Sequence, residues 1–217
     1  MNTFDPATVR RLFLVGIPIS FALLLLFHPL PDNGIYDGLH DHSRRWQVVH
    51  VTQLVFIGLL AVMMYLLVDG TAGRWTTVSR WALLPFVLFY GAFEAVTGIG
   101  TGVLIDHART LPDDEQVVAA GIIEAYWDNR IAGNVSVFSV IGALSWLVAV
   151  VGAVVALRRI GAPRSALVLP GLGGLLFAIS HAPPFGPVAL VLISAAVVRL
   201  GGRAVHFALP VEGTVTT

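Results

Sequence analysis

Two reactive residue types are missing from this chain. It has no cysteine, and all 13 of its basic residues are arginine, so it has no lysine either. Without cysteine there is no thiolate nucleophile, disulfide, iron–sulfur cluster or covalently attached c-type haem. Without lysine there is neither a retinal Schiff base nor a lysine nucleophile. Only three methionines are present, which argues against a methionine-lined Cu(I) path. Chemistry therefore falls to histidine, carboxylate and hydroxyl groups.

Charge is also scarce. Charged residues make up 12% of the chain, about half the share in an average soluble domain, while 56% of the residues are hydrophobic and the mean hydropathy is +0.82. These values predict an integral membrane protein whose first partners are membrane lipids and apolar small molecules. The 13 arginines balance 13 acids, so no overall field attracts nucleic acid. The sequence predicts no particular protein partner.

Apolar runs predict an all-α bundle of six transmembrane helices in a single domain, residues 1–217. A helix needs about 20 apolar residues to cross the bilayer core. The last two runs are short, and three prolines in SHAPPFGP separate them, so five spans with one broken hairpin is the alternative. The six expected spans are 12–30, 46–68, 79–104, 132–157, 166–182 and 184–200.

Arginine placement predicts the orientation, because cytoplasmic loops are enriched in positive residues. With the N-terminus inside, nine arginines, Arg203 among them, fall on the cytoplasmic face and four on the outer face. Both termini are therefore expected in the cytoplasm. VRRLFLVG contains the core of a twin-arginine export signal. The apolar run after it is long and lacks a small-x-small cleavage site, which predicts a retained first helix.

Two long outer loops are expected, at residues 31–45 and 105–131. The second contains TLPDDEQ, with a proline and acids suited to a helix N-terminus. Val118, Ile122 and Tyr126 then recur at helical spacing. We expect an amphipathic helix at the membrane interface, where Tyr126 and Trp127 suit the headgroup depth.

Polar residues gather toward the outer half of the expected bundle. Six of the seven histidines lie there, and only His206 lies on the cytoplasmic side. Two expected spans each carry one polar stripe at helical spacing. Because polar groups in lipid need partners, the stripes should face each other or a shared wet cavity. The first stripe is Trp46, His50 and Gln53, and the second is Tyr90, Glu94, Thr97 and Thr101.

Glu94 is the only acid deep within an expected span. An ionisable residue there indicates function by default, and the alternative is a protonated carboxyl bonded to a neighbouring helix. Next to it, GIGTG removes side-chain bulk. This favours close helix packing, with room for a flat ligand as the alternative.

Three histidines, His28, His50 and His181, should lie at similar depth on three different helices. Together with Glu94 they are candidate ligands of a divalent metal, and two of the imidazoles could instead hold haem b. No HExxH or paired HxxxH motif supports either interpretation. His40 and His42 are interpreted as solvated loop residues.

Arg44 and Arg45 could bind cofactor carboxylates or phosphates, or simply extend along the interface. They complete the set of candidate site residues.

Three functions remain open at this point. The first is a membrane-embedded enzyme acting on an apolar, lipid or isoprenoid-like substrate, by metal-assisted chemistry or with Glu94 and His50 as an acid/base pair. The second is a haem b protein for electron transfer or sensing. The third is a structural subunit of a membrane complex, or a conduit for protons or small solutes.

Overall fold

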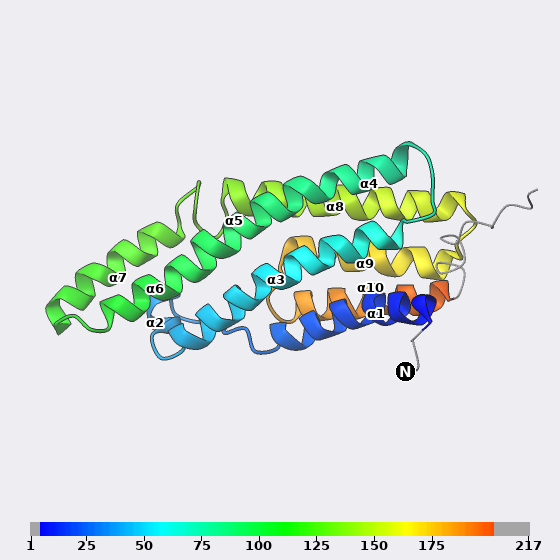
Figure 1. Cartoon of the computed structure of the whole chain (residues 1–217). Helices are drawn as coiled ribbons and strands as arrows, with labels where there is room; N and C mark the ends of the chain where they lie inside the picture. Colours follow the sequence, from blue (N-terminus) through cyan, green and yellow to red (C-terminus); the bar gives the residue numbers. More distant parts are fainter. Residues whose placement is uncertain (1–4, 202–217) are drawn as a thin grey trace, which may run out of the picture.

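The computed structural model describes residues 5–201, and within that range it contains helices and no strand. This confirms the predicted all-α class. Arg203 and His206 lie outside the described residues. Most helices run along one long axis (Figure 1). In chain order they are α1 (Pro6–Leu25), α2 (Ile35–Leu39), α3 (Ser43–Leu67), α4 (Arg74–Pro85), η1 (Phe86–Tyr90), α5 (Gly91–Phe93), η2 (Glu94–Ile99), α6 (Gly100–Ala108), α7 (Asp113–Trp127), α8 (Val137–Arg159), α9 (Arg164–Ile179) and α10 (Phe185–Leu200).

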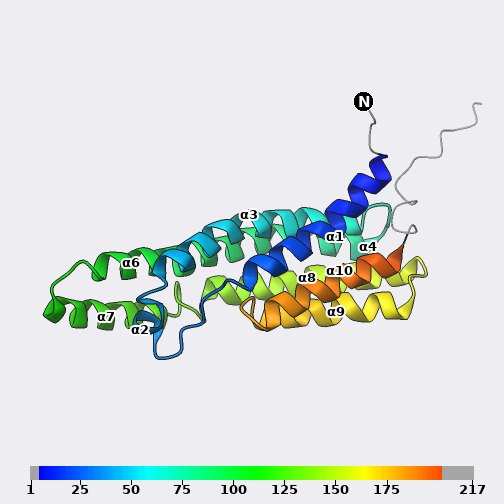
Figure 2. The same cartoon turned by 90° about the horizontal axis from the view of Figure 1, so that it is seen from below.

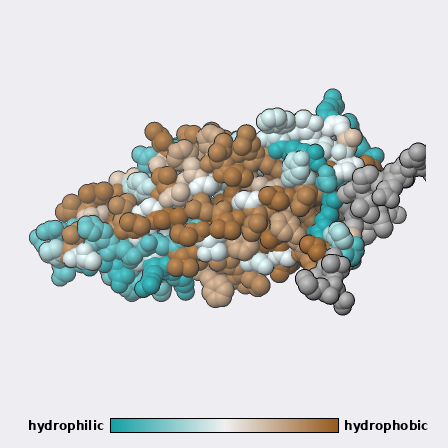
Figure 3. All heavy atoms as spheres, viewed as in Figure 1, coloured by the Kyte–Doolittle hydropathy of each residue, from teal (hydrophilic) through white to brown (hydrophobic). Residues whose placement is uncertain are grey.

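Four helical segments in the described part of the chain are long and apolar enough to cross a membrane: α1, α3, α8 and the continuous stretch Arg74–Ala108. The helices α9 and α10 are apolar but have only 16 residues each. Apolar side chains cover the middle of the molecule, and polar ones gather at its two ends (Figure 3). These features indicate an integral membrane protein.

Helix ends differ from the expected spans where local capping decides them. The fourth expected span begins at residue 132, but α8 begins at Val137, because the Ser136 side chain accepts a hydrogen bond from Ser139 N–H and the Ser139 hydroxyl accepts one from Ser136 N–H. This reciprocal cap satisfies free donors at the helix start. The first helix starts earlier than expected, at Pro6, where the Asp5 side chain accepts from Thr8 N–H.

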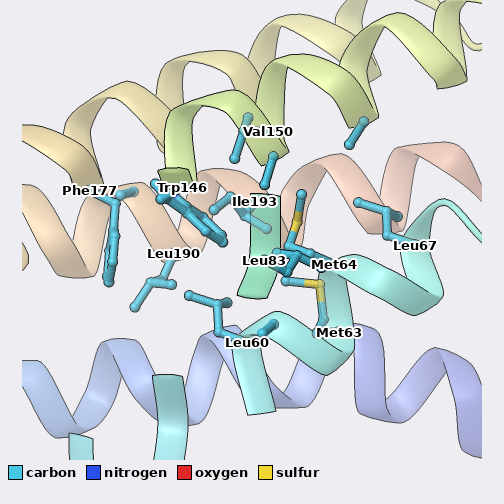
Figure 4. Packing of buried hydrophobic residues seen from close by; sticks show 14 of the residues in the cluster. Leu60, Met63, Met64, Leu67, Leu83, Trp146, Val150, Phe177, Leu190 and Ile193 are labelled. Atoms are coloured by element: carbon cyan, nitrogen blue, oxygen red, sulfur yellow. The ribbon is translucent and has the colours of Figure 1, made fainter. Parts of the chain in front are cut away.

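The core lies where α3, α8, α9 and α10 meet (Figure 4). Trp146 of α8 is fully buried, with its ring centroid 5.0 Å from that of Phe86 and 5.5 Å from that of Phe177. Met63 and Met64 of α3 belong to the same cluster. This packing holds the spanning helices in a fixed arrangement, so side chains at their ends have defined neighbours.

The stretch from α4 to α6 is one continuous helix with two π-helical segments, η1 and η2. Pro85, the last residue of α4, has no N–H, and η1 follows it directly. Such wide turns are frequent at functional sites because they redirect the side chains around them. Tyr90 ends η1 and Glu94 begins η2.

One end of the molecule, which we call the α7 end, is formed by α2, α6 and α7. The α6–α7 pair projects beyond the other helices in both views (Figures 1 and 2). Three acids occupy the first turn of α7, as TLPDDEQ predicts, and Tyr36 N–H of α2 donates to Glu124 at 3.0 Å. Ile123 faces α2 and α6, whereas Val118 and Ile122 are exposed. The segment 31–45 is therefore partly helical, and α7 packs beside α6.

The contact between α4 and α8 gives a test of the bundle. A Cβ on Gly152 would lie 2.9 Å from Ser79 N, whereas one on Gly58 would meet nothing within 4 Å. We expect Gly152→Leu to destabilise the protein by about 1–3 kcal/mol through overpacking, which lowers the thermal midpoint in detergent by several degrees. Gly58→Leu is the matched control. Equal midpoints for the two variants would contradict the α4–α8 packing.

Candidate metal site

Three histidines and one glutamate from four parts of the chain meet in the bundle. The nearest ring nitrogens of His28, His50 and His181 all lie within 4.8 Å of one another. Glu94 lies between two of them: His50 Nε2 is 3.7 Å from Oε2, and His181 Nε2 is 3.8 Å from Oε1. The structure therefore brings together the four candidate metal ligands.

Each of the four comes from a different helix end or face. His28 follows the last turn of α1, where its N–H donates to Leu25 O, and His50 lies on α3. Glu94 begins η2, and His181 follows the end of α9. His50 is 2% exposed and Glu94 is 0% exposed. The four groups converge in the interior, where water does not solvate them freely.

The second nitrogen of each imidazole is already held. His28 Nδ1 lies 2.7 Å from Pro29 O, and His50 Nδ1 lies 2.8 Å from Trp46 O. A carbonyl can only accept, so both Nδ1 atoms carry the hydrogen and each Nε2 presents a lone pair. His181 Nδ1 contacts the Tyr90 hydroxyl at 3.0 Å. Protein metal sites orient imidazole ligands through such bonds.

The converging atoms lack other partners. Among the described residues, Nε2 of His28 and of His181 and both oxygens of Glu94 are buried and make no hydrogen bond. Burying such groups without a partner costs free energy. These four unsatisfied atoms are therefore available to a ligand.

Glycines make room for this arrangement. A Cβ on Gly98 would lie 2.0 Å from the His50 ring, and one on Gly186 would lie 1.7 Å from His181 O. A Cβ on Gly102 would lie 2.4 Å from Gln47. The GIGTG segment thus lets α3 approach η2 and α6 closely, which was the favoured interpretation of its small residues.

The two polar stripes face each other across α3 and η2. Trp46 Nε1 donates to Gly98 O at 2.6 Å, and the Tyr126 hydroxyl donates to Val96 O at 2.6 Å. These two bonds satisfy carbonyls in the irregular ladder of η2. Burial raises the pKa of the Tyr126 phenol, which keeps it a donor at neutral pH. Thr97 donates to Gly133 O at 3.3 Å.

A pocket of about 410 Å³ opens beside the three histidines, which makes them accessible to a ligand, whereas Glu94 does not line it. Trp46, Tyr90 and Thr97 from the two polar stripes, which we expected to border a shared cavity for substrate, also line it. Gln53 and Thr101 are fully buried but do not line it, and their polar side-chain atoms have no partner among residues 5–201.

Four other polar residues that the sequence singled out lie outside this pocket. Arg44 and Arg45 are exposed on the first turn of α3 and do not line the pocket. His40 Nδ1 contacts Asp41 at 3.0 Å, and neither His40 nor His42 belongs to the histidine cluster.

One wall of the pocket was missed by the sequence reasoning. Trp127 at the end of α7, Asn134 in the following loop, and Ser139 and Val140 in the first turns of α8 all line it. Their only sequence signal is position: Asn134, Ser139 and Val140 lie at the start of the fourth expected span, and Trp127 lies in the expected outer loop just before it. No spacing pattern pairs α8 with the histidines.

Comparisons with protein-family models, with curated proteins and with solved structures find no match to this chain. Inference about function therefore depends on the geometry of the site.

The unsatisfied polar atoms predict a stability effect. Glu94→Leu removes two buried acceptors that lack hydrogen bonds, so in metal-free detergent buffer we expect a thermal midpoint equal to or a few degrees above that of the unsubstituted protein. The control is Ser79→Ala, which removes a satisfied buried hydroxyl that donates to Ala149 O at 2.8 Å and should lower the midpoint. A lowered midpoint for Glu94→Leu would identify Glu94 as a structural group.

Proposed function

We propose that this protein is a membrane-embedded enzyme that uses a divalent metal ion, held by His28, His50 and His181 beside Glu94, to act on an apolar, lipid-like substrate. One observation carries the proposal: the ring nitrogens of the three histidines lie within 4.8 Å of one another, and Nε2 of His28, Nε2 of His181 and both Glu94 oxygens make no hydrogen bond among the described residues. Imidazole and carboxylate are the ligands that zinc and similar ions take in catalytic sites.

The distances suit a single ion. For metal–ligand bonds of about 2.0–2.1 Å, two ligands of a tetrahedral ion lie roughly 3.4 Å apart. The two histidine–glutamate distances, 3.7 and 3.8 Å, need to close by only a few tenths of an ångström, whereas the three histidine nitrogens, which lie within 4.8 Å of one another, need to approach by up to about 1.4 Å. The hydrogen bonds at each Nδ1 already fix the ring orientations that such an ion requires.

The same distances disfavour the two other interpretations of these residues. A direct acid/base pair needs heavy atoms at about 2.6–3.2 Å, and His50 and Glu94 are 3.7 Å apart. A haem with two axial histidines needs a wide, flat space between them. Here a third imidazole lies within 4.8 Å of both of the others, and Glu94 reaches between two of them.

The pocket supports catalysis rather than a purely structural ion. Structural zinc sites are closed by four protein ligands, whereas catalytic sites keep one position open to water or substrate. An ion here would border a pocket of about 410 Å³, and it would polarise a substrate carbonyl or phosphoryl group or acidify a bound water. Glu94, on the same site, can hold the ion or accept a proton.

The topology we propose has six spans, with both termini in the cytoplasm and α7 on the outer side. The helices α9 and α10 pack against each other and against α8 and α1, and 16 residues extend about 24 Å, close to the thickness of the bilayer core. Arginines at the end opposite α7 support the orientation. Arg80 and Glu94 share one helix and lie roughly 20 Å apart along it, a separation that supports a site in the outer part of the bilayer.

Metal content tests the function. Full-length protein purified in detergent and exposed to Zn²⁺ should retain about one ion per chain after desalting, measured by plasma mass spectrometry. His28→Ala, His50→Ala and His181→Ala should each lower this value at least tenfold, because each removes a direct ligand.

His40→Ala and His42→Ala are matched controls, because both residues are histidines outside the cluster. They should leave the metal content unchanged. Equal losses for cluster and control variants, or no retained ion in the unsubstituted protein, would refute the metal site.

Because the chain has no cysteine, single cysteines can test the topology. In intact cells a membrane-impermeant maleimide should label Asp37→Cys and Phe185→Cys. Arg159→Cys should react only after the membrane is opened. Labelling of Arg159→Cys in intact cells would reverse the orientation, and protection of Phe185→Cys there would contradict six spans.

A further inference from the structure

We call the pocket of about 410 Å³ beside the histidines the metal pocket. A second pocket adjoins it. It measures about 430 Å³ and is lined by Trp127, Asp128, Arg130, Asn134 and Val135. Three of these residues, Trp127, Asn134 and Val135, line both pockets. The linings of the two pockets therefore meet at these three residues and form one surface, with a polar part after the end of α7 and a further part at the histidines.

The polar part carries two side chains of opposite charge, Asp128 and Arg130, which do not pair with each other. Among residues 5–201, neither Asp128 nor Arg130 forms an ion pair within 4.0 Å, and their side chains make no hydrogen bond. Both are exposed. A guanidinium binds phosphate well, and a carboxylate binds ammonium. One zwitterionic group would satisfy both side chains.

The metal pocket also has an apolar branch that leads sideways. Val140 and Ala143 of α8 line it on one side, and Ala178 and Ile179 of α9 line it on the other. Val140 is 46% exposed and Ile179 is 62% exposed, and both belong to apolar helices. An acyl chain lying between α8 and α9 would contact apolar side chains and continue into the surrounding lipid.

We propose that this continuous surface binds a phospholipid with a zwitterionic headgroup, such as phosphatidylethanolamine. Its phosphate lies against Arg130 and its ammonium against Asp128, and an acyl chain extends between α8 and α9. The glycerol backbone then lies next to the histidines. This last point rests on the proposed function, whereas lipid binding itself does not need the metal.

Lipid binding can be measured by native mass spectrometry of the full-length protein in detergent. The probes are dioleoyl phosphatidylethanolamine, the anionic dioleoyl phosphatidylglycerol, and dioleoylglycerol, which has the same chains and no phosphate. Arg130→Gln should weaken binding of both phospholipids about tenfold, because a charge-assisted contact to phosphate is lost, and leave dioleoylglycerol unchanged. Asp128→Asn should weaken phosphatidylethanolamine alone.

Arg45→Gln is the matched control, since Arg45 is exposed at the start of α3 and lies outside both pockets. It should change none of the three affinities. Val140→Trp fills the apolar branch and should weaken all three lipids. If Arg45→Gln has the same effect as Arg130→Gln, or if Asp128→Asn affects both phospholipids equally, the assigned headgroup site is wrong.

The metal content of the same samples separates this proposal from the proposed function. Arg130→Gln and Val140→Trp should keep the full zinc content while lipid binding falls. Unsubstituted protein that binds phosphatidylethanolamine but retains no zinc would refute the metal site alone. Protein that retains zinc but does not distinguish the lipids, or binds none of them, would refute the phospholipid site alone.

Discussion

Inside a bilayer a polar side chain has no water to bind, so each one needs a partner within the protein. This constraint organises the interior of the bundle. Trp46 and Tyr126 satisfy carbonyls of η2, and Ser79 satisfies a carbonyl of α8. The histidine nitrogens and Glu94 oxygens in the centre break the pattern. Gln53, Thr101 and Trp146 also have buried polar atoms without a partner, but the histidine and Glu94 atoms are the ones that lie next to one another.

Much of the fold follows from hydropathy, because the bilayer requires long apolar segments and the described part of the chain has four long and two shorter apolar helices. Hydropathy alone does not predict the site. Its residues could be predicted only from the expected topology, which gives the depth of each residue in the bilayer. His28 and His181 each precede a proline at the end of an apolar run, and this places them at one depth with His50. Similar depth brings the three histidines to one plane, and the packing of the helices then brings their ring nitrogens within 4.8 Å of one another.

The remainder could not be read from the sequence for physical reasons. The π-helical segment η1 directly follows Pro85, and η2 begins nine residues after it; no residue periodicity encodes either segment. Asn134, Ser139 and Val140 join the site because α8 packs against α4 and η1, and that pairing is set by side-chain shape. The start of α8 depends on the Ser136–Ser139 cap, which moved the helix away from the expected residue 132. The hydropathy pattern predicts neither the long-range packing of side chains nor the short-range capping of helix ends.

The ligand positions also have a consequence for how the protein is made. His28 and His50 enter the membrane early in synthesis, whereas His181 precedes the last helix of the bundle. Helices α1 and α3 can pair while translation continues, but the fourth group arrives only once α9 has been inserted. The histidine cluster is therefore complete only late in biogenesis, and an ion bound there would link the end of the first helix to the end of α9. Such an ion would mark a chain in which every helix up to α9 has been inserted.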